Sequence, residues 1–85
     1  MDVDYRAFGR RLKEARARAG LSQEALGRSC RLHRTEISLL ERGARDPRLS
    51  TIVRLAKCLG VSPAALLDDE GSWRPFDALA DEPES

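Results

Sequence analysis

Residues 21–43, LSQEALGRSCRLHRTEISLLERG, constrain the fold of this chain more than any other stretch. Ser22 and His33 each stand where a helix N-cap is expected, and a serine hydroxyl can accept a hydrogen bond from a free backbone N–H of the first turn. Gly43 suits the left-handed residue that ends a helix. Each cap is flanked by apolar residues at the spacing of a hydrophobic staple, which are Leu21 with Leu26 and Leu32 with Ile37. The stretch therefore predicts two short helices joined by a tight turn.

The second of these predicted helices has an apolar side and a polar side. At about 100° per residue, Ile37 and Leu40 fall together, with Glu41 at the edge of their face. The opposite face carries a guanidinium, two hydroxyls and a leucine, followed by a second arginine: Arg34, Thr35, Ser38, Leu39 and Arg42. Arginine can bind guanine or phosphate, hydroxyls accept several partners, and leucine can contact a thymine methyl. We interpret the pair as a helix-turn-helix unit with a DNA-facing second helix.

The remaining sequence predicts three more helices and no strand. A first helix runs from about Tyr5 to Arg18 and ends at Gly20, with Phe8, Leu12, Ala15 and Ala19 on one face. A fourth helix follows the loop at Asp46-Pro47 and closes at Gly60, with Leu49, Ile52, Leu55, Ala56 and Leu59 on its inner face. Ser62 and Pro63 suit the start of a short fifth helix that ends at Leu67. We therefore expect an all-α fold, with a compact five-helix domain over residues 1–67.

Four of these motifs, in this order, carry a resemblance to a known family. They are "GLSQEAL", "LHRTEISLLERG", "DP" and "LAKCLGVSPAALL". With them, the region from about Arg6 to Leu67 resembles the lambda-repressor-like, Xre-type helix-turn-helix family of bacterial and phage regulators. The resemblance implies a sequence-specific transcriptional regulator that binds a double-stranded DNA operator, a short inverted repeat, as a homodimer.

The resemblance also implies roles for individual residues. The base-reading positions would be Arg34, Thr35, Ser38 and Leu39. The phosphate-binding positions would be Ser22, Gln23, Arg42, Gly43 and Arg45. An ion pair between Arg16 and Glu41 would attach the second helix of the motif to the first helix of the domain. The chain departs from the family pattern at Glu36, where close relatives often have an aromatic residue, and at Leu39, where a small or polar residue is common.

The charge of the chain is divided unevenly between its two parts. The 85 residues have a net charge of +1. Residues 1–67 hold 14 basic and 7 acidic side chains, which gives +7, whereas residues 68–85 hold 1 basic and 7 acidic, which gives −6. A basic helical body suits a phosphate-binding surface. A solvated helix surface is the alternative explanation for the same charge.

No pattern in the sequence indicates catalysis, a cofactor or a metal. Cys30 and Cys58 fall at apolar helix positions, so we expect reduced, buried thiols, although a redox switch between them stays possible. His33 is the single histidine, and Cys30 with His33 lacks two further metal ligands. No apolar run approaches the ~20 residues of a membrane span, and the N-terminus lacks a signal-peptide pattern. We therefore expect a cytoplasmic protein that is not an enzyme.

The acidic C-terminal tail, residues 68–85, leaves two interpretations open. One is a disordered end, and the other is a docking segment for the dimer partner or for a separate protein. We expect the fifth helix and the tail to supply the dimer interface through Val61, Leu66, Leu67, Trp73 and Phe76. A protein partner bound through the tail defines an alternative function, that of an antitoxin or adaptor.

Overall fold

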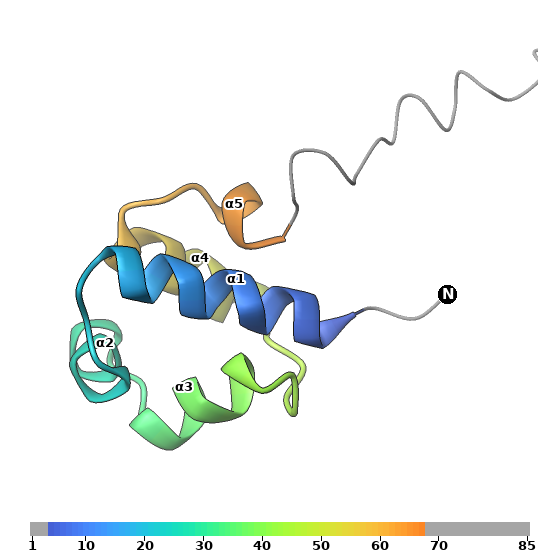
Figure 1. The fold of residues 1–85 in the computed structure, drawn as a ribbon, viewed down its shortest axis with the longest axis horizontal. Helices are drawn as coiled ribbons and strands as arrows, with labels where there is room; N and C mark the ends of the chain where they lie inside the picture. The colour runs from blue at the N-terminus through green and yellow to red at the C-terminus, as the bar shows by residue number, and fades with distance from the viewer. Residues whose placement is uncertain (1–3, 68–85) are drawn as a thin grey trace, which may run out of the picture.

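The computed structural model describes residues 4–67 of the chain and contains five helices (Figure 1). They are α1 (Tyr5–Arg18), α2 (Gln23–Cys30), α3 (Arg34–Glu41), α4 (Leu49–Leu59) and α5 (Pro63–Leu67). No strand occurs within these residues, so the prediction of an all-α, five-helix domain is confirmed. None of the helices in residues 4–67 is long and apolar enough to cross a bilayer.

Local capping explains where the first three helices begin. Asp4 accepts hydrogen bonds from the backbone N–H groups of Arg6 and Ala7, at 3.1 and 3.2 Å. Ser22 Oγ accepts from the N–H of Ala25, and His33 Nδ1 accepts from the N–H of Thr35, each at 3.0 Å. Each bond satisfies a backbone donor that has no partner inside its helix. The predicted caps at positions 22 and 33 are therefore present.

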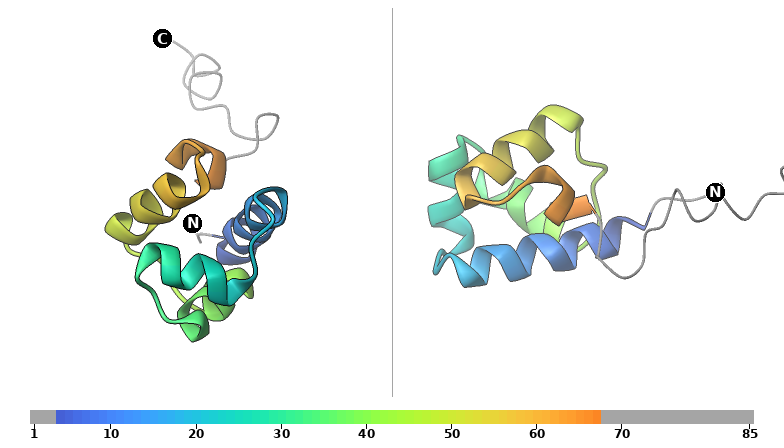
Figure 2. Two further views of the ribbon diagram at one scale, coloured as in Figure 1. Left: turned by 90° about the vertical axis from the view of Figure 1, so that its left-hand side faces the viewer. Right: turned by 90° about the horizontal axis from the view of Figure 1, so that it is seen from above.

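The core draws side chains from all five helices, and Figure 2 shows how these surround it. The helix α1 contacts α3 on one side and α5 on the other, while α4 contacts α2 and α5. The largest completely buried side chains are Leu12, Leu26, Ile37, Leu40, Leu55 and Leu66. Burying a leucine or isoleucine side chain contributes about 1.5–3 kcal/mol, so this cluster dominates the stability of the domain.

One predicted core position is wrong. Leu49 is the first residue of α4 and is 74% exposed. Ala19, which continues the apolar face of the first helix in the sequence, is exposed as well, since α1 ends at Arg18. Helical periodicity cannot reveal such end effects, because it identifies a face but not how far that face remains covered.

Close backbone contacts hold α3 against the rest of the domain. A Cβ atom placed on Gly9 would lie 2.3 Å from the carbonyl oxygen of Glu41 and 2.7 Å from that of Leu40. A Cβ atom on Gly27 would lie 2.5 Å from the carbonyl oxygen of Leu32. Both positions require glycine because the neighbouring backbone fills the space of a side chain. The end of α3 therefore packs directly on α1, and the turn before α3 packs directly on α2.

Candidate nucleic-acid interface

The connection between α2 and α3 is a turn of three residues, 31–33. Arg31 caps α2 in the left-handed conformation, with φ 61° and ψ 41°. The N–H of Leu32 donates to the carbonyl oxygen of Gly27 at 2.8 Å, which closes the end of α2. Two short helices joined in this way form the predicted helix-turn-helix unit.

The outer face of α3 carries the four predicted base-reading residues. Arg34 and Thr35 are exposed, whereas Ser38 and Leu39 are half-buried. On the inner side, Ile37 and Leu40 are completely buried. The polar face therefore turns to solvent because the apolar face is fixed in the core.

An ion pair fixes the end of α3 to α1. Arg16 Nε lies 2.5 Å from Glu41 Oε2, and Arg16 Nη2 lies 3.0 Å from Glu41 Oε1. The side chains of Arg16 and Glu41 are 15% and 4% exposed. The hydrogen bond to Glu41 raises the pKa of Arg16 above its usual range, so the guanidinium stays charged. The pair that the family resemblance implied is therefore present in the fold.

Gln23 takes part in the same network, which the sequence analysis did not predict. Its Nε2 donates to Glu41 Oε1 at 3.0 Å, while Arg16 Nη1 donates to the carbonyl oxygen of Leu21 at 2.9 Å. One carboxylate thus links α3 to both α1 and the start of α2. Gln23 keeps a second amide hydrogen, which a phosphate can accept.

The other predicted phosphate-binding residues lie around the ends of α2 and α3. Ser22, Arg42 and Arg45 are exposed. Gly43 has φ 72° and lies against the backbone of Arg6, so neither its conformation nor its surroundings suit a side chain. Gln23 is bonded to Glu41, and positions 42–45 directly follow it, so the start of α2 and the loop after α3 lie together at the C-terminal end of α3.

Glu36 is an acidic residue of α3 that lies beside Arg45, one of the predicted phosphate-binding residues. Its Oε1 lies 3.4 Å from Arg45 Nη1, and the side chains of Glu36 and Arg45 are 27% and 50% exposed. The sequence analysis noted Glu36 as a departure from the family pattern but did not predict its partner. The carboxylate neutralises one of the arginines that would otherwise be available to phosphate.

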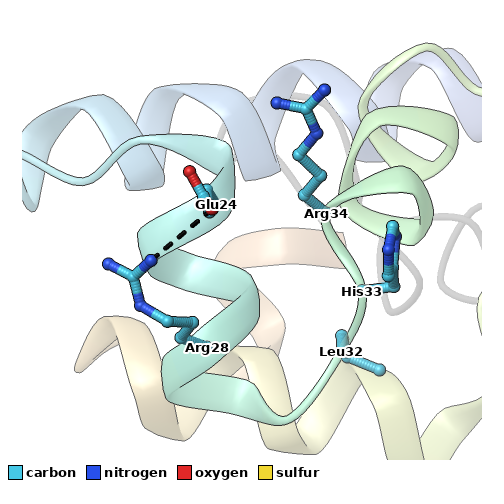
Figure 3. A pocket seen from close by; sticks show the side chains of 5 residues that line it. All are labelled: Glu24, Arg28, Leu32, His33 and Arg34. Carbon is cyan, nitrogen blue, oxygen red and sulfur yellow. Dashed lines mark ion pairs between the residues drawn. The ribbon is translucent and has the colours of Figure 1, made fainter.

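A shallow hollow of about 300 Å³ lies where α2 meets the start of α3 (Figure 3). It is lined by Glu24, Arg28, Leu32, His33 and Arg34. Arg28 Nη1 lies 3.7 Å from Glu24 Oε2, and both of these side chains are mostly exposed. Within residues 4–67, no three metal-ligating side chains gather at one place. The hollow is therefore part of an open, charged surface and not an enclosed ligand pocket.

The predicted dimer interface needs a correction at one residue. Leu66 is completely buried in the core of its own chain, so the prediction that it supplies a two-fold interface is wrong. The reason is that α5 packs against both α1 and α4, and Leu66 fills the space between them. Leu67 is 51% exposed and Val61 is half-buried, so both can still contact a partner. Trp73 and Phe76 lie outside the described residues.

Comparison with known proteins identifies the family to which this arrangement belongs. Residues 7–69 match the family described as "Helix-turn-helix domain". The chain is 45% identical over 62 residues to control protein C.BamHI of Bacillus amyloliquefaciens, covering 72% of this chain and 76% of that protein. It is 32% identical over 78 residues to the HTH-type transcriptional regulator YonR of Bacillus subtilis, derived from the SPbeta prophage, covering 92% of this chain and 72% of that protein.

A solved structure is similar in fold as well as in sequence. The restriction-modification controller protein C.AhdI from Aeromonas hydrophila superposes with a TM-score of 0.73 and 41% identity, over 74% of this chain and 91% of that one. The family match spans the helix-turn-helix unit and the helices that support it. This chain is therefore a member of the helix-turn-helix family of DNA-binding transcriptional regulators.

Proposed function

We propose that this protein regulates transcription as a homodimer that binds a short inverted repeat, with α3 of each protomer in the major groove. One observation carries the proposal. The outer face of α3 is partly or fully exposed along its length, while Ile37, Leu40 and the Arg16–Glu41 pair fix the helix from behind. A helix fixed in this way holds each outer side chain opposite a particular base pair, which sequence reading requires.

In the proposed complex, Arg34, Thr35, Ser38 and Leu39 contact base edges. Arg34 is the strongest candidate for a bidentate contact to guanine, since it is exposed in the first turn of α3. Thr35 and Ser38 donate or accept hydrogen bonds, and Leu39 contacts a thymine methyl. Base contacts of this kind determine sequence preference.

Phosphate contacts fix the position of the protein on the duplex. We assign them to Ser22, Gln23, Arg42, Gly43 and Arg45. The domain of residues 1–67 carries +7, which supports a large electrostatic contribution to binding. Binding of this kind weakens steeply as salt rises, because each neutralised phosphate releases a counterion.

Dimerisation would place two α3 helices about 34 Å apart, in successive major grooves. We propose that Val61 and Leu67 contribute to the interface, together with Trp73 and Phe76 in the tail. Leu67 supports this assignment, because it is a large apolar side chain that is half exposed at the end of α5. We expect the protein to act in the cytoplasm, without a cofactor and without enzymatic activity.

Two of the similar proteins suggest which genes the protein regulates. C.BamHI is a control protein and C.AhdI is a restriction-modification controller. We propose that this protein likewise controls a restriction-modification system. Restriction and modification genes beside its own gene would support this assignment, and their absence would leave a phage or other bacterial regulator.

Selection of bound DNA from a random pool tests the proposal, with the full chain as bait. We expect enrichment of an inverted repeat whose half-sites lie about one helical turn apart. Light scattering of the purified complex should show two protomers on each repeat. A pool without enrichment would contradict the proposal, and a partner protein captured through residues 68–85 would then favour an adaptor or antitoxin.

A further inference from the structure

The fold brings Cys30 and Cys58 together. Cys30 is the last residue of α2, and its Sγ lies 3.9 Å from the carbonyl oxygen of Arg54 on α4. Arg54 precedes Cys58 by one helical turn, and a helical side chain leans back over the turn before it. The side chain of Cys58 therefore covers the turn that the Cys30 sulfur contacts. Cys58 is also the neighbour that, after burial, raises the pKa of the Cys30 thiol.

We propose that Cys30 and Cys58 form an oxidisable dithiol, a modification site at which a hydroperoxide converts the two thiols into one disulfide between α2 and α4. Both cysteines are free thiols in the structure. Neither belongs to the outer face of α3, so the pair is a feature of the domain separate from its proposed DNA contacts.

The two thiols differ in burial, and this difference determines which of them reacts first with the hydroperoxide. Cys58 is half-buried, so a small peroxide can reach it, whereas Cys30 is 1% exposed. Burial, followed by the interaction with Cys58, raises the pKa of the Cys30 thiol to about 12. Cys30 therefore stays protonated and is not the first thiol to react with a peroxide, since the thiolate is the nucleophile.

The thiolate of Cys58 reacts first with the hydroperoxide. Its sulfur bonds to one peroxide oxygen, the O–O bond breaks, and the other oxygen leaves and takes up a proton as water or an alcohol. The Cys30 sulfur then bonds to the Cys58 sulfur, and the hydroxide of the sulfenic acid leaves as water with the proton of Cys30. One hydroperoxide is reduced while two thiols are oxidised to one disulfide.

The disulfide would close a covalent ring that includes the turn of the helix-turn-helix unit. The segment between Cys30 and Cys58 contains the turn, all of α3 and most of α4. A disulfide that closes such a ring restricts the unfolded chain and so stabilises the folded one. Oxidation would therefore stabilise the helix-turn-helix unit, while Arg34 and Thr35 stay exposed on the other side of α3.

The test uses the reduced full chain and hydrogen peroxide, followed by intact mass and peptide mapping without reductant. We expect a monomer that is lighter by about 2 Da, with one crosslinked peptide pair that contains Cys30 and Cys58 and is restored by dithiothreitol. The melting temperature of the oxidised chain should rise by several degrees. Cys58→Ser should lose both effects, and Cys30→Ala should leave Cys58 as a sulfenic or sulfinic acid.

Three results would overturn the inference. The first is sulfinic acid on Cys58 of the unmutated chain without the internal crosslink. The second is the formation of disulfides only between two chains. The third is the absence of any reaction in the folded protein under conditions that oxidise the denatured protein. Peptide mapping of the unmutated chain shows whether the Cys30–Cys58 crosslink forms, even if a variant does not fold.

Discussion

Arg16 on α1 and Glu41 at the end of α3 form a two-pronged ion pair whose carboxylate is almost fully buried. The two hydrogen bonds measure 2.5 and 3.0 Å, and Glu41 is 4% exposed. Bidentate pairs of this type are stronger than single contacts, and little water is present to screen this one. Because Gln23 donates to the same carboxylate, a single acid connects three helices.

Replacing Glu41 with Ala should therefore destabilise the domain. The change leaves the Arg16 guanidinium without its partner in a mostly buried position, which costs about 3 kcal/mol. Thermal unfolding measures the loss, and DNA affinity should fall with it because α3 loses its attachment to α1. The matched control is Glu24→Ala, since Glu24 belongs to a mostly exposed pair with Arg28 and should cost less than about 1 kcal/mol. Equal melting temperatures for the two variants would contradict the role of the pair.

Substituting Gly9 with Ala tests the close contact between α1 and α3. Alanine favours a helix more than glycine does, so an isolated helix would gain stability. In this fold the new Cβ would lie 2.3 Å from the carbonyl oxygen of Glu41, so α3 must shift. We expect a loss of about 1–3 kcal/mol in a urea titration. Arg10→Ala, at the exposed neighbouring position, should change stability little, and a stabilised Gly9→Ala variant would show that the contact is absent.

The helix ends were predictable from the sequence because the groups that decide them are local. Ser22, His33 and Gly60 each act within a few residues of themselves. The inner and outer faces of α3 followed in the same way from the positions of Ile37 and Leu40.

Contacts between distant residues were not predictable from the motifs. Gln23 binds a carboxylate on another helix, and nothing near it in the sequence indicates that partner. Leu66 could face the core or a second protomer with the same pattern, and only the packing of α5 against α1 and α4 decides between them. Apolar spacing gives the face of a helix but not which element covers it.

Glu36 should reduce the affinity of the protein for DNA in general. Its carboxylate lies 3.4 Å from Arg45 and competes with phosphate for that guanidinium. We expect Glu36→Gln to bind all sequences more tightly and to release about one more counterion in a salt titration. Glu14→Gln removes an equal charge from α1 and serves as the control. If both variants shifted affinity and salt dependence alike, only net charge would be acting, and the local competition would be disproved.

Alkaline conditions should destabilise the reduced protein through Cys30. Burial raises the pKa of this thiol from its ordinary value of 9.0 to about 12. Between pH 9 and pH 12 the folded protein keeps the Cys30 proton, whereas the unfolded chain releases it. The contribution of the buried, protonated thiol to the stability of the fold is therefore complete below about pH 9 and is lost as pH rises toward 12. Wild type should lose stability faster than Cys30→Ala, by on the order of 1 kcal/mol per pH unit. Urea titrations under reducing conditions measure this difference, and parallel curves for the two proteins would refute it.

Sequence reading by the outer face of α3 is the central claim, and affinity measurements on single base-pair variants of the selected operator test it most directly. Arg34 is exposed in the first turn of α3, where it can contact a base edge. Arg34→Ala should weaken binding to the preferred operator by about 1–3 kcal/mol and remove discrimination at one base pair of each half-site. Discrimination elsewhere in the operator should persist. If Arg34→Ala instead weakened binding to every sequence equally, Arg34 would contact phosphate, and the claim that it reads bases would fail.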